Sequence, residues 1–266
     1  MNFFQCLLQK NDCYLANKYI TPTRIVVHST GANNKRISRY VQPHSSQTTG
    51  LKYYYDGKSY DLAKSDIIKY FGKNAYNNDW NRSGIGACVH AFIGELADGS
   101  IATCQTLPWK MRCWGCASGK NGSFNNTAIQ FEICEDSTND KDYLAKVYKE
   151  AVALCAHLCK YYNISPEMIV SHKEACAMGY ASNHGDVEHW WTKHGYTMAQ
   201  FRKDVKSKMW ENEHAITPTT DTANNSTSTE EQKTIYRVQV GAYSNRDNAE
   251  AMLNKLKAAG YDAFIR

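Results

Sequence analysis

Residues 171–191 read SHKEACAMGYASNHGDVEHWW, and the rest of the chain is organised around this stretch. It contains His172, His184 and Asp186, three side chains that can bind a metal ion. The residues between His172 and Asp186 have no sustained apolar period, and two glycines can bend the chain there. We therefore expect a folded-back loop, not a helix face, to bring the candidate ligands together.

A further candidate ligand, His28, follows the run Ile25-Val26-Val27. Three β-branched residues in a row are typical of a buried strand, which places the imidazole at the C-terminal rim of that strand. Sites in α/β sheets lie at this rim. The run Ile169-Val170-Ser171 before His172 repeats the pattern and predicts that His172 reaches the same rim. A single histidine is usually an ordinary residue that makes a hydrogen bond. Several histidines at strand ends and in one loop favour a metal site, because two histidines and a carboxylate are a recognised set of zinc ligands.

A third apolar run, residues 128–134, is predicted to be a central strand, and it contains Glu132 between apolar neighbours. A carboxylate there is costly to bury unless it is paired or poised for chemistry. Glu135 and Asp136, which follow the run, are expected to be solvated charges at the strand end.

Two more strands are predicted over residues 89–93 and 101–106, because Asp98-Gly99 between them is a strong hairpin signal. His90 is expected on the first of these strands. Residues 142–162 repeat their apolar positions at intervals of three and four, which predicts an amphipathic helix that covers one face of a sheet.

In the remaining parts of the chain, turn residues and helix caps predict the secondary structure. A last helix is predicted over residues 198–210, with Thr197 as its N-cap. Much of residues 31–80 is rich in Asn, Ser, Gly and Tyr and is expected to be loop, apart from a short helix over residues 61–70. Tyr53 and its two neighbouring tyrosines are expected to cover the core, although a sugar-binding groove is the alternative.

Composition limits the possible functions. The chain has 266 residues, 42% of them hydrophobic, and a net charge of only +5, so one substantial domain with a small appendage is expected and nothing argues for a nucleic-acid partner. Residues 1–12 lack a basic leader and a long apolar stretch, and no later run is long enough to span a membrane. We therefore expect synthesis in the cytoplasm without a signal peptide.

The ten cysteines are accordingly expected to be reduced and to act mostly as small buried hydrophobes. Cys113 and Cys116 have the CxxC spacing of a redox or metal motif. A second such pair is missing, so packing in the core or a loop is favoured over metal binding, and a Cys-rich metal or redox protein remains a distant alternative.

Four separated segments resemble, in order, the motifs of zinc-dependent N-acetylmuramoyl-L-alanine amidases of the type 2 family: residues 25–30 (IVVHST), 88–94 (CVHAFIG), 126–132 (NTAIQFE), and 171–172 (SH) followed by 182–186 (SNHGD). Those enzymes cut the amide between the muramic acid lactyl group and L-alanine in peptidoglycan, and they share a fold with peptidoglycan recognition proteins. The resemblance runs from about residue 2 to residue 209.

The resemblance implies a role for each candidate residue. His28, His172 and Asp186 would bind Zn²⁺, Glu132 would act as the base for the attacking water, and His184 would stabilise the oxyanion. The residues alone leave open whether His184 or Asp186 is the third ligand. For His90 the resemblance implies a position at the floor of the site. A histidine packed on its strand, without a function, is an equally good interpretation.

The sequence departs from the family pattern at three places. Val89 stands where some relatives have a tyrosine at the site, and Gly115 follows Trp114 where many have a histidine. Residues 44–73 look like an insertion.

The tail has a different character. Residues 211–234 are dominated by Thr, Ser, Asn, Asp and Glu, which predicts a disordered linker. Residues 236–244 are a predicted strand, 248–259 a predicted helix and 261–265 the start of another strand. This βαβ piece resembles the first half of a sporulation-related (SPOR) repeat, a domain that binds glycan strands stripped of their peptides.

The sequence thus predicts an α/β fold with a mixed central β-sheet, flanking helices and a zinc site at one rim, followed by a small truncated βαβ segment. The expected domains are a catalytic domain over residues 1–210, the linker over 211–234 and the SPOR-like segment over 235–266. The expected partners are bacterial peptidoglycan and, through the tail, its glycan strands. The protein would act on the cell wall after release or non-classical export, as a phage endolysin or an autolysin. The main alternative is a non-catalytic peptidoglycan-binding protein on the same fold.

Overall fold

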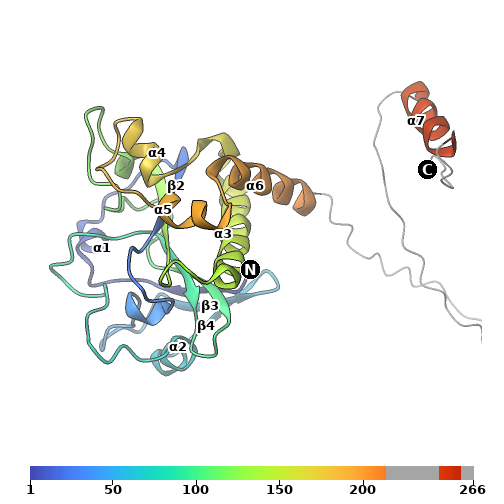
Figure 1. Ribbon diagram of the computed structural model, residues 1–266. Coiled ribbons are helices and arrows are strands. Elements are labelled where there is room, and N and C mark those ends of the chain that lie inside the picture. The colour runs from blue at the N-terminus through green and yellow to red at the C-terminus, as the bar shows by residue number, and fades with distance from the viewer. Residues whose placement is uncertain (214–245, 259–266) are drawn as a thin grey trace, which may run out of the picture. The chain divides into compact units, whose positions relative to one another are not determined.

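The computed structural model describes residues 1–213 and 246–258 (Figure 1). The chain divides into two units, Met1–Ile216 and Thr217–Arg266. In the second unit the structure describes α7 (Arg246–Ala258), in agreement with the helix predicted over residues 248–259. The strands predicted over residues 236–244 and 261–265, and all but the first residues of the predicted linker, lie outside the described residues.

The first unit is built on an eight-stranded mixed sheet with the strand order β4-β3-β1-β6-β5-β7-β2-β8. Neighbouring strands are parallel from β5 through β7 and β2 to β8, whereas β5 and β6 form the predicted antiparallel hairpin. The predicted α/β fold is confirmed. The strands are β1 (Phe3–Cys6), β2 (Arg24–Ser29), β3 (Leu51–Tyr55), β4 (Lys58–Asp61), β5 (Ala91–Glu95), β6 (Ile101–Gln105), β7 (Ala128–Ile133) and β8 (Ile169–Ser171).

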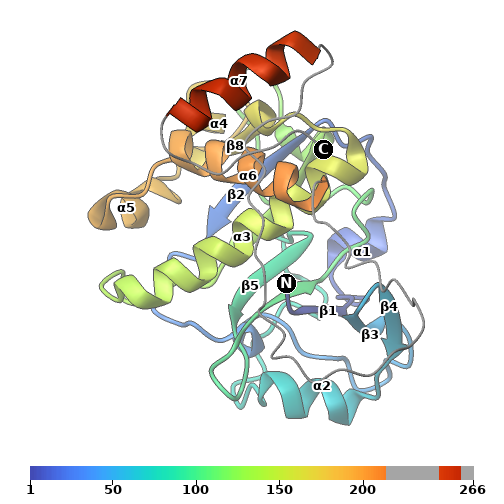
Figure 2. The same cartoon turned by 90° about the vertical axis from the view of Figure 1, so that its right-hand side faces the viewer.

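One face of the sheet is covered by α3 (Lys141–Tyr162) and α6 (Met198–Glu213), which Figures 1 and 2 show side by side. The N-terminus of α3 is capped by Asp140, whose side chain accepts the Tyr143 N–H. The predicted cap of α6 is also present, because the Thr197 hydroxyl accepts the Gln200 N–H. The short helix α5 (Glu188–Trp191) adds its two buried tryptophans to the same apolar core.

The other face is covered by shorter elements. These are α1 (Asp12–Ala16), a 3₁₀ turn over Ile37–Arg39 and α2 (Lys64–Phe71), whose apolar side chains pack against β1, β5 and β6. At the β2–β8 end of this face lies α4 (His172–Ala177), which begins with a capping box between Ser171 and Glu174.

Alternation along β2 decides which side chains reach the site. Ile25 and Val27 point into the core under α3, so Val26 and His28 point to the opposite face, beside α4. In β7, Phe131 likewise faces α3, and Glu132 is therefore on the same face as His28. The parallel register pairs His28 directly with Glu132. Strand periodicity thus brings two of the predicted functional residues together.

The short helix expected over residues 61–70 is present as α2, and much of residues 31–80 is loop as expected, but the sequence did not indicate the β3–β4 hairpin. Asp56 and Gly57, between β3 and β4, have positive φ angles of 48° and 70°. A two-residue hairpin turn formed by an Asp-Gly pair requires positive φ at both residues. Two of the three tyrosines cover the core as expected, because Tyr53 and Tyr54 pack against opposite faces of the sheet. Tyr55, at the strand end, is exposed.

Two other expectations are corrected. Glu135 and Asp136 are buried, not solvated: the loop after β2 and α5 contact Glu135, and the chain turns around Asp136 after β7. Asp136 accepts the N–H groups of residues 138, 139 and 140 in this turn. His90 precedes β5 instead of lying on it. Both its ring nitrogens are bonded to the backbone, at Met111 and Gln130, which makes it a structural residue.

All ten cysteines are free thiols and nine are buried, as expected for small hydrophobes. Cys113 and Cys116 are fully buried, and among the described residues neither belongs to a cluster able to hold a metal. No helix in the described part of the chain is long and apolar enough to cross a membrane.

Candidate active site

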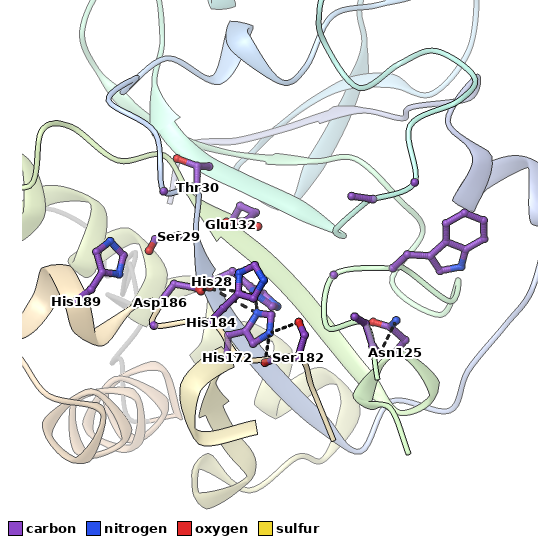
Figure 3. Close-up of a pocket in the computed structure, with 17 residues that line it drawn as sticks. His28, Ser29, Thr30, Asn125, Glu132, His172, Ser182, His184, Asp186 and His189 are labelled. Atoms are coloured by element: carbon purple, nitrogen blue, oxygen red, sulfur yellow. Dashed lines mark hydrogen bonds and ion pairs between the residues drawn. The ribbon is translucent and has the colours of Figure 1, made fainter. Parts of the chain in front are cut away.

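A cavity of about 770 Å³ opens at the C-terminal ends of β2 and β7 (Figure 3). The candidate ligands His28, His172 and Asp186 line it together with Glu132 and His184. The folded-back segment is held by backbone hydrogen bonds from Lys173 N to Asp186 O and from Ser182 N to Cys116 O. Part of this segment is helical, in α4 and α5, which the sequence did not indicate.

His28, His172 and Asp186 form the one group in the described part of the chain that could hold a metal ion. The two Nδ1 atoms are 3.0 Å apart, and Asp186 Oδ2 is 3.3 Å from His28 Nδ1 and 3.7 Å from His172 Nδ1. In a tetrahedral zinc site with bonds near 2.0 Å, ligand atoms are roughly 3.3 Å apart. The spacings of the three atoms therefore fit a zinc ion, which His28, His172 and Asp186 would hold at the edge of the cavity.

The other nitrogen of each histidine is held by the protein. His28 Nε2 lies 3.0 Å from Gln130 Oε1, and His172 Nε2 lies 3.1 Å from the Ser182 carbonyl oxygen. An acceptor at Nε2 keeps the proton there and leaves Nδ1 as the free ligand atom. Ring orientation is thus fixed from outside the ligand set, as expected of a metal site.

Gln130 belongs to a buried polar network behind His28. Its Nε2 donates to Asn125 Oδ1, and its Oε1 also accepts from the Cys116 thiol. Gly115 is part of this arrangement, because a Cβ atom there would lie 2.4 Å from Gln130 Oε1. A larger residue at position 115 therefore requires the glutamine to move, which explains the glycine in this chain.

Charge interactions differ among the three candidate ligands. Burial lowers the pKa of His28, but hydrogen bonds with Asp186 and Cys116 outweigh it and hold this pKa well above its ordinary value. Burial and the neighbouring His28 lower the pKa of His172 to about 4. Burial raises the pKa of Asp186, yet the hydrogen bond and charge of His28 leave it below its ordinary value. Asp186 is consequently a carboxylate at neutral pH.

Glu132 stands beside the ligand group without a partner of its own. Its Oε2 atom is buried and has no hydrogen bond within the described residues. Burial raises the pKa of Glu132 to about 7, although the nearby His28 opposes the rise. A carboxyl group poised near neutrality at the edge of a cavity is suited to accept and release a proton.

His184 lies above the ligand group at the opening of the cavity. Its ring stacks on His172 with centroids 4.7 Å apart, and its Nδ1 is 3.9 Å from Asp186 Oδ1. The side chain is 62% exposed, whereas that of Asp186 is 11% exposed. Asp186 is thus placed for coordination and His184 for contact with a bound molecule, and their roles stay predictions.

Sequence reasoning missed several residues of the site. Gln130 is the only polar residue besides Glu132 in the run 128–133, a signal that could have indicated its function. Cys116 was expected to be packing, and its thiol lies 3.9 Å from His28 Nε2. Val89 is buried and does not line the cavity.

Comparison with known proteins gives two family matches. The model of the family described as N-acetylmuramoyl-L-alanine amidase matches residues 18–189, and that of the SPOR domain matches residues 211–266. The first match includes all five predicted site residues. No curated protein sequence matches the chain.

Several solved structures are similar to the chain at low identity. The Staphylococcus aureus hydrolase AmiA in complex with its ligand has a TM-score of 0.46 at 19% identity, with 76% of this chain and 82% of that chain covered. The PlyG catalytic domain has a TM-score of 0.47 at 19% identity, with 79% and 96% covered. A mutant endolysin from Bacillus subtilis has a TM-score of 0.43 at 20% identity, with 77% and 99% covered. These likenesses are too weak to add to the family match.

Proposed function

The chain belongs to the N-acetylmuramoyl-L-alanine amidase family, and we propose that it hydrolyses the amide between the lactyl group of muramic acid and L-alanine in bacterial peptidoglycan. His28, His172 and Asp186 would hold a zinc ion through Nδ1, Nδ1 and Oδ2. Zinc bound there supplies a Lewis acid that polarises the scissile carbonyl and acidifies water.

The chain's own residues would perform the proton transfers. Glu132, whose carboxyl group lines the cavity, takes a proton from the attacking water and returns it to the leaving L-alanine nitrogen. His184, exposed at the cavity opening, donates a hydrogen bond to the oxygen that becomes negative in the tetrahedral transition state. Gln130 and Ser182 keep both ligand histidines in the tautomer that presents Nδ1.

The observation that carries this proposal is the buried, unpaired oxygen of Glu132 beside three ligand atoms in tetrahedral spacing. A non-catalytic binding protein has no need of such a carboxylate, because an unpaired buried oxygen costs stability. The arrangement therefore favours hydrolysis over binding alone.

The test is hydrolysis of purified bacterial cell walls, followed by identification of the new amino terminus. We expect release of peptides that begin with L-alanine, loss of activity with a chelator and recovery with zinc. New reducing sugar ends in place of new amino termini would contradict the proposal, since they would show that a glycosidic bond is cut.

We also propose that the chain acts on the cell wall after release or non-classical export, and that its tail binds glycan strands. The SPOR match over residues 211–266 supports the second point. The full-length chain should bind glycan strands stripped of their peptides, as measured by co-sedimentation. Absence of binding to such strands would contradict it.

A further inference from the structure

A second histidine–carboxylate pair, outside the candidate metal group, lies at one side of the same cavity. His189 Nε2 is 3.1 Å from Glu135 Oε2. The carboxylate is almost fully buried, with 3% of its side chain exposed, whereas 38% of the His189 side chain is exposed and lines the cavity. Glu135 Oε1 accepts the Gly31 N–H, so both oxygens of the buried carboxylate are used.

This geometry fixes the imidazole and leaves one edge of it free. Because a carboxylate oxygen can only accept a hydrogen bond, Nε2 of His189 is protonated and donates a hydrogen bond to Glu135. Nδ1 has no hydrogen-bond partner among the described residues. The backbone N–H of His189 bonds to the Gly185 carbonyl, which holds α5 beside the metal-group loop. A ring anchored in this way presents Nδ1 to whatever fills the cavity.

The cavity offers few other positive groups. Its described lining contains no lysine and no arginine. Apart from the candidate ligands, His184 and His189 are the only lining side chains that can carry positive charge. His184 is assigned to the oxyanion under the proposed function, which leaves His189 for any further anionic group of the substrate.

The two ends of the cavity differ in character. Figure 3 shows His189 on one side of the His28–Asp186 group and Asn125 on the other. The Asn125 side chain is an uncharged amide, and its Oδ1 atom accepts the Cys116 N–H and the Gln130 amide. The scissile amide joins a neutral, hydroxyl-rich glycan to an anionic peptide, so the two parts must leave the metal group in opposite directions.

We propose that His189, oriented by Glu135, binds a carboxylate of the stem peptide on the leaving-group side of the scissile amide. This inference rests on the proposed function. In the complex, the imidazolium form of His189 donates a hydrogen bond from Nε2–H to Glu135 and another from Nδ1–H to the substrate carboxylate. His189 is thus a substrate-binding residue, and Glu135 is a positioning residue that acts through it.

The experiment compares two soluble substrates that differ in one group, muramyl-L-alanyl-D-glutamate with a free α-carboxylate and its α-amide. The wild-type chain should cleave the acid with roughly ten- to a hundredfold higher kcat/KM than the amide, because a hydrogen bond to a charged group has about that strength. His189→Gln should reduce this ratio to about one, mainly through a higher KM for the acid, without loss of zinc.

The variant Glu135→Gln tests the positioning role of Glu135 through the same ratio of kcat/KM values for the acid and the amide. The glutamine amide donates to His189 Nε2 and moves the ring proton to Nδ1, so the imidazole stays in place but loses the anion that balances its charge. The acid-to-amide ratio should fall again, and a merely structural role for Glu135 would lower both rates equally. His157→Gln, at an exposed histidine on α3 away from the cavity, is the matched control and should keep the wild-type ratio.

Three outcomes would overturn the assignment. These are an unchanged ratio in His189→Gln, an equal loss on both substrates in that variant with zinc retained, and a wild-type preference for the amide, which would make Nδ1 an acceptor. A zinc-loaded wild-type chain that releases no L-alanyl peptide from either substrate or from intact walls would overturn the proposed function together with the inference.

Discussion

Replacing Glu132 with glutamine should abolish most of the activity and, at the same time, stabilise the metal-free protein at alkaline pH. Glutamine has nearly the same shape but cannot accept the water's proton, so the rate should fall by about 10²- to 10⁴-fold, the usual contribution of a general base. Zinc content should stay at the wild-type level, because Glu132 is not in the ligand group.

The size of the stability effect follows from the pKa of Glu132. Burial raises this pKa from 4.5 to about 7. Below about pH 4.5 the carboxyl is protonated in both folded and unfolded chains, and no penalty arises. As pH rises through 7, ionisation favours the unfolded chain by the difference between the two pKa values, at about 1.4 kcal/mol for each unit. The wild-type chain should therefore lose on the order of 3 kcal/mol of unfolding free energy that the glutamine variant keeps.

The assay is urea denaturation of both proteins with a chelator present, at about pH 4.5 and about pH 8. All other titrating groups are common to the two chains, so the difference between their unfolding free energies reports Glu132 together with its charge interaction with His28. That difference should be near zero at the lower pH and favour the variant at the higher pH. A difference that is the same at both values would refute the reasoning, since Glu132 would then be as well solvated in the folded chain as in the unfolded one.

Three further predictions concern the metal group. His184→Ala should keep near-normal zinc and lose about a hundredfold in turnover, whereas Asp186→Ala should lose zinc and activity together; elemental analysis that finds zinc missing only from the His184 variant would exchange the two roles. Gln130→Leu removes the acceptor that fixes the His28 tautomer, so zinc affinity measured by chelator competition should fall by about 10- to 100-fold, and wild-type affinity would contradict that function. Purified protein should contain about one zinc per chain, and a metal-free preparation with full activity would show that the metal is unnecessary.

The sequence predicted the parts of the site that depend on strand pattern. A β-branched run followed by histidine indicated the rim positions of His28 and His172, because side-chain alternation and parallel pairing leave little freedom there. One wrong prediction also concerned local structure. Asp56-Gly57 is a hairpin signal, but the tyrosines around it have no apolar alternation, so the sequence favours a loop where the structure has the β3–β4 hairpin.

Contacts between distant segments were beyond sequence reasoning. The position of Glu135 directly after a strand favours exposure, yet its burial depends on α5, which lies more than fifty residues later in the chain and places His189 against it. The choice of Nδ1 as ligand atom depends in the same way on Gln130 and Ser182, which meet the two histidines only in the folded chain.

Glu132 and Glu135 show how one stretch of chain produces two different carboxylates. Glu132 is inside β7, where the sheet fixes its direction beside His28 and neighbouring strands occupy the backbone groups that might otherwise bond to it. Glu135 lies beyond the end of the strand, where the loop after β2 brings the Gly31 N–H and α5 brings an imidazole. A carboxylate with two hydrogen-bond partners can orient a neighbour, whereas burial without a partner raises the pKa of Glu132 to about 7 and suits it to exchange a proton near neutral pH. The end of the strand at Ile133 therefore separates the residue suited to move a proton from the one suited to hold a binding group.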